Sequence, residues 1–252
     1  MLLSPSASGL RVLLEKFTGL AAHHDLQINV QKTKVVIFHA GRKPYRDVDF
    51  HIHNKKIEVV ACYKFLGSYL SFNLKNYDDI CRVQKSFNLK VGMLLRKFHA
   101  VQLDIKIMLF DMLCMDLYGA DLWWNNEGCS SILNSLSVSY HYALKRILGL
   151  PKRSSNHYAC YLLDKPIFKH LLNFRMLKLY RWLVKSNSIC LSVNKLWLLN
   201  HSSLKIKLDA IFHDVYGIDD IIENDIDAIF SRIIYVQNRE EASWSVNDLV
   251  LN

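Results

Sequence analysis

The 252-residue sequence has no long apolar run, no glycine-rich phosphate loop and no internal repeat. A membrane-spanning helix needs roughly 18 consecutive apolar residues, and no stretch reaches that length. The apolar run at residues 1–3 is too short for the core of a signal peptide. We therefore expect an intracellular protein, in the nucleus or the cytoplasm, that is not secreted and has no membrane partner.

The sequence also lacks the motifs of metal sites and of serine hydrolases. No Gly-x-Ser-x-Gly elbow occurs. His51 and His53 have no Cys or acidic residue at ligand spacing, and the adjacent His23 and His24 cannot converge on one ion. We expect no metal or other cofactor in this chain. Free buried thiols are expected instead of disulfides, because no Cys-x-x-Cys pair exists among Cys62, Cys81, Cys114, Cys129, Cys160 and Cys190.

What the chain does have is apolar content and positive charge. Hydrophobic residues make up 51%, enough for a core, and the net charge is +9. Residues 1–110 carry 17 Lys and Arg against 8 Asp and Glu, residues 111–205 carry 12 against 5, and residues 206–252 carry 3 against 10. A basic body ending in an acidic tail favours RNA or DNA as a partner through phosphate contacts. The alternative is that the charge only keeps the protein soluble. The oligomeric state stays open.

Residues 1–72 read as one helix followed by short strands. Apolar residues at helical spacing after Ser4-Pro5-Ser6 predict a helix over residues 7–24. Alternation over residues 26–30 and the apolar run 35–38 predict two strands around a polar turn at 29–34. A loop is expected at residues 41–44. Residues 48–60 read as a hairpin turning at Asn54-Lys55, because asparagine tolerates positive φ.

After Gly67 the apolar period changes to 3.6. Helices are predicted over 78–99 and 103–119, through Leu133 to Ile147 with an end at Gly149, and over 167–185, with two further candidates at 204–214 and 219–234. The expected fold class is α+β, with a small sheet followed by mostly helical structure. The expected regions are residues 1–72, a helical region 73–205 and an acidic tail 206–252.

An ordered set of motifs carries a resemblance. A helix, Leu26-x-Ile-Asn-x-x-Lys32-Thr-Lys, a hairpin and then Tyr63-Lys-Phe-Leu-Gly67 resemble the distal palm and thumb of reverse transcriptases from LINE-type (non-LTR) retrotransposons. In that family the catalytic aspartates lie in a Tyr/Phe-Ala-Asp-Asp turn shortly before Leu-Ser-Pro-Ser, which stands here at residues 3–6. The resemblance implies that those aspartates, and the Mg²⁺ they bind, lie upstream of residue 1. It therefore implies an RNA-directed DNA polymerase fragment that is inactive alone.

The resemblance also suggests roles for single residues. It implies that Lys32 stands near the phosphates of the incoming nucleotide and that residues 63–67 form a primer grip. A basic stripe on the helix at 167–185, beside Tyr180 and Trp182, suggests a second contact with a phosphate backbone. The expected nucleic-acid-binding residues are Asn29, Lys32, Thr33, Lys34, Phe65, Leu66, Gly67, Arg175, Lys178, Arg181 and Lys185, and no catalytic residue is expected.

Each of these proposed binding residues also has a purely structural interpretation, which stays open. Lys32 can be a solvated turn lysine, residues 65–67 can be core residues ending a strand, and the basic stripe can be a solvated helix face. Tyr77-Asp78-Asp79 looks like a polymerase signature but opens a helix, where aspartates complement the helix dipole, so we reject it as a catalytic motif. The alternative function is a non-catalytic helical protein that binds nucleic acid or another partner. A remnant that scarcely folds alone is a third possibility.

Overall fold

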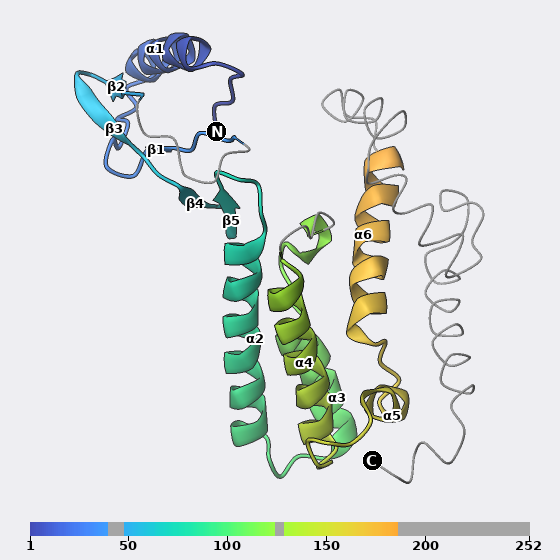
Figure 1. Ribbon diagram of the computed structural model, residues 1–252. Coiled ribbons are helices and arrows are strands. Elements are labelled where there is room, and N and C mark those ends of the chain that lie inside the picture. The colour runs from blue at the N-terminus through green and yellow to red at the C-terminus, as the bar shows by residue number, and fades with distance from the viewer. Residues whose placement is uncertain (40–47, 124–128, 186–252) are drawn as a thin grey trace. The chain divides into compact units, whose positions relative to one another are not determined.

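The computed structural model describes residues 1–39, 48–123 and 129–185 (Figure 1). The loop expected at 41–44, Cys190, the helices expected at 204–214 and 219–234 and the acidic tail lie outside these residues. The chain divides into two compact units, Met1–Asp78 and the residues from Asp79 onward. Helices and small sheets are both present, which confirms the α+β class.

The first unit opens with α1, Ala7–His23, which confirms the helix expected at 7–24. Ser6 is its N-cap, because its side-chain oxygen accepts a hydrogen bond from the Gly9 backbone N–H at 3.1 Å. Leu14 and Ala21 lie one above the other on the buried face of the helix. Together with strand residues Val35, Phe50, Ile52 and Ile57 they form the small core of this unit.

A three-stranded sheet lies against α1 in the order β1-β3-β2. Its strands are β1 Lys34–Val35, β2 Phe50–Ile52 and β3 Lys55–Val59, with β1 parallel and β2 antiparallel to β3. The hairpin expected at 48–60 is therefore present. Its turn is His53-Asn54, one residue earlier than expected, and both residues have positive φ (47° and 62°). His53 thus belongs to the turn and does not share a strand with His51.

The strand predicted over residues 26–30 does not form. The backbone groups of this stretch find local partners instead: Leu26 N–H donates to the Ala21 carbonyl at the end of α1, and Thr33 N–H donates to the Asn29 carbonyl. Leu26 is 66% exposed, while Ile28 and Val30 pack against the core of the unit, so the alternation marks a partly buried face that forms without a strand. The predicted run at 35–38 is likewise a strand only as far as Val35. Local turn hydrogen bonds have replaced the expected ladder.

A separate two-stranded hairpin completes the first unit. β4, Cys62–Phe65, pairs antiparallel with β5, Ser68–Ser71. The two residues between them, Leu66 and Gly67, both have positive φ (45° and 93°), as a type I′ turn requires. The positive φ expected at Gly67 is confirmed, while that of Leu66 was not foreseen.

The second unit is helical. Its elements are α2 Tyr77–Lys97, which begins at the boundary, α3 Leu103–Cys114, the 3-10 turn η1 Ala120–Leu122, α4 Ser130–Ile147, α5 Asn156–Leu162 and α6 Phe168–Lys185. The helices expected at 78–99, through 133–147 and at 167–185 are confirmed. The helix expected over 103–119 ends five residues early, at Cys114, and α5 was not predicted. None of the helices in the described ranges is long and apolar enough to cross a membrane.

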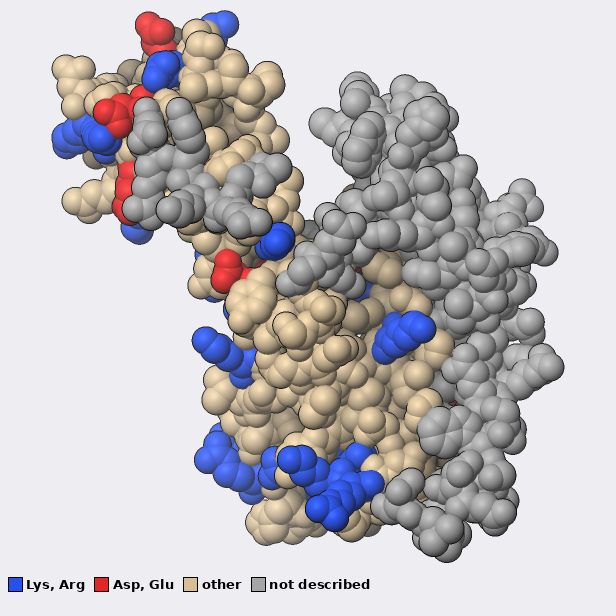
Figure 2. Space-filling view, viewed as in Figure 1, with Lys and Arg blue, Asp and Glu red and all other residues tan. Residues whose placement is uncertain are grey.

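Charged side chains on the helical unit are mostly basic (Figure 2). Arg96 and Lys97 stand in the last turn of α2, and Lys145 and Arg146 in the last turn of α4. Cations are favourable there because the carboxyl end of a helix carries partial negative charge. α2 and α4 run in the same direction, so their last turns lie at the same end of the unit (Figure 1).

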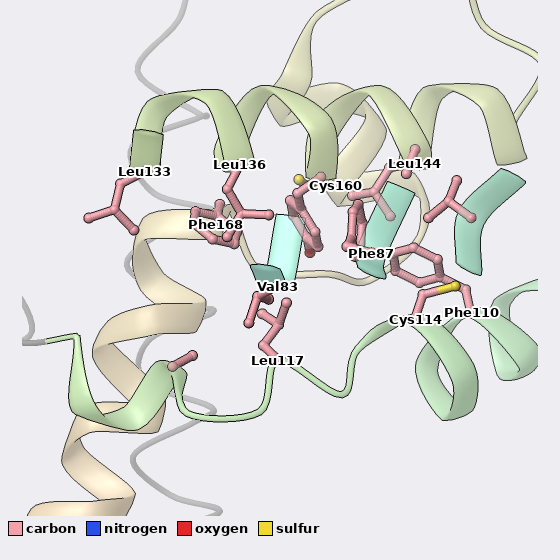
Figure 3. Packing of buried hydrophobic residues seen from close by; sticks show 14 of the residues in the cluster. Val83, Phe87, Phe110, Cys114, Leu117, Leu133, Leu136, Leu144, Cys160 and Phe168 are labelled. Carbon is pink, nitrogen blue, oxygen red and sulfur yellow. The ribbon is translucent and has the colours of Figure 1, made fainter. Parts of the chain in front are cut away.

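The apolar faces of α2, α3, α4, α5 and α6 meet in the large core of the helical unit (Figure 3). Leu136 and Leu144 of α4 are fully buried there. Phe87 and Phe110 meet edge to face with ring centroids 6.1 Å apart. Tyr140 is buried as well, and its hydroxyl donates to the Pro166 carbonyl at 2.8 Å. This core fixes where the surface side chains of the unit stand.

Candidate nucleic-acid interface

The polar turn that precedes β1 is held by its own side chains. The Asn29 side-chain oxygen accepts from the Lys32 backbone N–H at 3.0 Å, and the Thr33 hydroxyl donates to the Asn29 carbonyl at 2.8 Å. These bonds fix the turn but leave the Lys32 side chain exposed. Lys34 is different, because its ammonium pairs with Glu58 on the neighbouring strand β3. Of the two lysines, Lys32 is therefore the one presented to solvent.

The β4–β5 hairpin lies next to this turn. The Tyr63 hydroxyl of β4 donates to the Lys32 carbonyl at 3.4 Å, which joins two segments about thirty residues apart in sequence. Phe65 is half-buried, whereas Leu66 at the tip is 75% exposed. A leucine held at positive φ and turned to solvent is uncommon, and backbone strain of this kind gathers at functional sites.

Together the turn and the hairpin line one pocket of about 420 Å³, which we call the turn–hairpin cleft. Lys32, Thr33 and Lys34 contribute one wall, and Tyr63, Phe65 and Leu70 contribute another. The remaining walls come from the chain start, α1 and β1–β2, with Met1, Leu2, Leu3, Ser4, Leu10, Leu14, Phe17, Ile28, Val35, Val36, Phe38 and Ile52. The structure thus brings together four of the residues predicted from the sequence, with Asn29 bonded behind them, while Leu66 and Gly67 form the hairpin tip.

The turn–hairpin cleft combines apolar surface with one exposed cation. Its walls are mostly apolar and aromatic, and Lys32 supplies a positive charge without a carboxylate partner in the hydrogen bonds and ion pairs described above. A lysine ammonium is a point charge that can meet a phosphate, and an aromatic wall can contact a sugar or a base.

The basic stripe on α6 has a different environment. Arg175 points inward: its guanidinium donates to the Met115 carbonyl at 2.6 Å and to the Leu117 carbonyl at 3.3 Å. These carbonyls follow the end of α3, and they also accept from the backbone N–H groups of Leu117 and Ala120 respectively. Arg175 therefore holds the α3–η1 connection against α6, a structural role that the sequence pattern did not reveal.

Lys178 and Trp182 of α6 line a second pocket, of about 760 Å³, with Arg175. Lys178 is exposed, and Trp182 is 61% exposed. The same pocket contains Asp111, whose carboxylate pairs with Lys165 at 2.7 Å, so its lining carries both signs of charge. The backbones of Arg181 and Lys185 continue α6, and their side chains lie outside the described residues.

The aspartates of Tyr77-Asp78-Asp79 have structural partners. Asp78 accepts a hydrogen bond from the Ser71 hydroxyl at 2.8 Å. Asp79 is buried, pairs with Arg82 at 2.9 Å and accepts from the Trp123 indole N–H at 3.2 Å. Both residues stand in the first turn of α2, as expected from the rejection of Tyr77-Asp78-Asp79 as a polymerase signature. Within the described part of the chain, no three His, Cys, Asp or Glu side chains group as metal ligands would.

Two features of the candidate interface escaped sequence reasoning. The contact between Tyr63 and Lys32 joins distant segments, and no local pattern marks it. The only sequence signal for the strained conformation of Leu66 is its position before Gly67 in a short connection between two strands. That signal is weak, because leucine is rare in a type I′ turn.

Comparisons of this chain with models of protein families, with curated proteins and with solved structures found no match.

Proposed function

We propose that this chain is part of a LINE-type reverse transcriptase, comprising the distal palm and the helical thumb, and that its own task is to hold nucleic acid. One observation carries the proposal. The two motifs that resemble the family, at residues 26–34 and 63–67, meet through the Tyr63 hydroxyl and line one cleft. Two short motifs matched by chance have no reason to adjoin, whereas a surface that holds a primer end needs both.

In this proposal the chain does not polymerise by itself. Nucleotidyl transfer requires two metal ions held by converging carboxylates. Asp78 and Asp79 do not fit that role, because Ser71 engages the first and Arg82 and Trp123 engage the second. We therefore derive no chemical step from the residues of this chain.

A second candidate function is a non-catalytic helical protein that binds nucleic acid and does not use the cleft. Its support is the charge of the helical unit, since residues 79–185 contain 16 Lys and Arg against 7 Asp and Glu. The two candidates differ at Lys32. Only the reverse-transcriptase proposal requires this lysine to contact a phosphate.

The test is a titration of the full chain with a fluorescent RNA–DNA hybrid at several salt concentrations between about 50 and 200 mM. We expect binding whose affinity falls log-linearly with salt. The slope is that of the logarithm of the binding constant against the logarithm of the salt concentration. Lys32→Gln should reduce its magnitude by about 0.9, the value for one lost phosphate contact on B-DNA. Lys16→Gln, which removes an exposed lysine from α1, is the matched control and should leave the slope unchanged.

The possible results separate the candidates. Absence of binding at about 50 mM salt would contradict both functions. Binding that is the same in Lys32→Gln and in the wild-type chain would favour the second. Incorporation of nucleotides by this chain alone, in a primer-extension assay with Mg²⁺ and an RNA template, would contradict the absence of polymerase activity.

A further inference from the structure

The positive charge of the helical unit gathers at one end. Gln84 of α2 donates to Ser135 at 2.7 Å and to Ser139 at 3.2 Å on α4, which fixes the register of the two helices. From Gln84 to Lys97 is thirteen residues, roughly 20 Å at about 1.5 Å each. A similar distance along α4 from the two serines reaches Gly149. Because both helices run the same way, their carboxyl ends are level (Figure 1).

Five exposed cations stand at this end: Arg96, Lys97, Arg146, Lys152 and Arg153. We call them the basic end. Figure 2 shows Lys and Arg side chains gathered at the lower edge of the helical unit. Asp104, in the first turn of α3, brings one negative charge to the same end. The Arg146 guanidinium lies 5.7 Å from the centroid of the Tyr142 ring, so this cation is partly held in place.

The loop that carries Lys152 and Arg153 is pre-ordered. α4 ends in a Schellman motif, in which Gly149, at φ 70°, donates to the Arg146 carbonyl and Leu150 donates to the Lys145 carbonyl. Lys145 is a buried residue, and its ammonium donates to the Lys152 carbonyl at 3.0 Å. A buried cation is costly unless it is bonded, so this contact marks a fixed position for the loop.

Helix stability explains only part of this charge. Arg96, Lys97 and Arg146 complement the negative ends of α2 and α4. Lys152 and Arg153 lie beyond the last turn of α4 and just ahead of the start of α5, where a helix dipole does not favour cations. Among the described residues, the side chains of Lys152 and Arg153 make no hydrogen bond or ion pair, and two such exposed cations on an ordered loop indicate a ligand of opposite charge.

We propose that the basic end binds the phosphate backbone of nucleic acid, with Lys152 and Arg153 as its principal contacts. The inference deepens the proposed function, on which it rests, by adding to the contact at Lys32 a further contact on the surface of the helical unit. An ordered loop loses little conformational entropy on binding, and the exposed cations release counterions from the backbone. Such binding depends on charge and spacing and does not read base sequence.

The test uses the full chain and the same labelled hybrid as above. The double variant Lys152→Gln/Arg153→Gln should reduce the salt slope by about 1.8, the effect of two phosphate contacts. The control is Lys16→Gln/Lys85→Gln, which removes the same charge from exposed positions on α1 and on the third turn of α2. Circular dichroism checks that both variants keep the helical content of the wild-type chain.

The failures of the two proposals are distinguishable. If the wild-type chain binds the hybrid but the double variant keeps both its affinity and its slope, the basic end is excluded while the proposed function stands. If Lys16→Gln/Lys85→Gln lowers the slope equally, only net charge matters and the inference is overturned. Displacement of the hybrid by poly-glutamate at equal charge would also overturn it, by assigning the surface to acidic protein segments.

Discussion

At the scale of single residues, the buried carboxylate of Asp79 is the clearest case of a polar side chain that supports the core. Its two oxygens are used by Arg82 and by the Trp123 indole, and its side chain is 5% exposed. Removing one partner of a buried pair costs roughly 3–5 kcal/mol. Because the Arg82 side chain is 23% exposed and can reach water, we expect the lower part of that range.

Asp79→Ala should therefore destabilise the helical unit by about 3 kcal/mol, measured by urea denaturation. The neighbouring Asp78→Ala is the control. Asp78 is exposed and bonded to Ser71 alone among the contacts described above, so its loss should cost less than about 1.5 kcal/mol. Equal costs for the two variants would contradict the structural role of Asp79.

His141 makes the stability of the helical unit depend on pH. Burial, followed by the charge of nearby Lys145 and the weaker influence of His157, lowers the pKa of His141 from 6.5 to about 4, although its ring hydrogen bond to the Ser137 carbonyl opposes the shift. The folded unit therefore binds fewer protons than the unfolded chain between these values. Its stability is full above pH 6.5 and falls as the pH drops toward 4.

We expect this effect to reach about 3 kcal/mol near pH 4, since one pKa unit corresponds to about 1.4 kcal/mol. His141→Gln should flatten the curve of unfolding free energy between pH 6.5 and about pH 4, measured by urea denaturation at each pH. His99→Gln, which changes an exposed histidine, should leave the curve unchanged. A wild-type curve that is already flat would refute the role of His141.

At the scale of elements, the β4–β5 hairpin combines strain with exposure. Leu66 occupies the first central position of a type I′ turn, where asparagine before glycine is favoured. Leu66→Asn should raise the stability of the first unit by about 1 kcal/mol, the cost of a left-handed conformation for a side chain such as leucine. If the hairpin tip contacts nucleic acid, the same variant should bind the RNA–DNA hybrid more weakly.

The comparison for that turn is Gly67→Ala. Its φ of 93° suits glycine, so alanine should destabilise the first unit by more than about 1 kcal/mol. Thermal unfolding of both variants shows whether each substitution raises or lowers the stability of the first unit relative to the wild-type chain. Lower stability of Leu66→Asn than of the wild-type chain would show that side-chain contacts of Leu66 outweigh the backbone strain.

Helices were predictable from sequence and short strands were not, for physical reasons visible in particular residues. Val83, Phe87, Val91 and Leu94 recur at helical spacing and are all buried, so the pattern fixed α2 almost to its ends. Residues 26–30 alternate equally well, yet Asn29 diverts the backbone into a turn. A strand needs a partner that the local pattern does not contain, whereas a helix bonds within itself.

For the candidate site, the sequence predicted that certain residues would lie together better than it predicted the direction in which their side chains point. Lys32 and Phe65 do line one cleft. Arg175, by contrast, has the charge and spacing of a solvent-facing stripe but donates to carbonyls at the end of α3. Whether an arginine faces solvent or a carbonyl depends on the helix packed against it, which periodicity within one segment does not reveal.

At the scale of the whole molecule, two separate cores predict two unfolding events. Leu136 in the core of the helical unit and Ile57 in that of the first unit are both fully buried. Leu136→Ala should cost about 2–5 kcal/mol and lower one thermal transition, while Ile57→Ala should lower the other. Calorimetry of both variants is the measurement. A single transition that shifts with either variant would mean that the units unfold together.

Three cysteines in the helical unit, Cys114, Cys129 and Cys160, are buried and belong to no disulfide. Burial also raises the pKa of the Cys114 thiol to about 11, so at neutral pH it is protonated as well as shielded. An alkylating reagent can reach these sulfurs only when the packing around them opens. The rate at which each cysteine is alkylated, followed by mass spectrometry, therefore reports how often the packing around that cysteine opens. The native cysteines serve as the probes, and none has to be introduced.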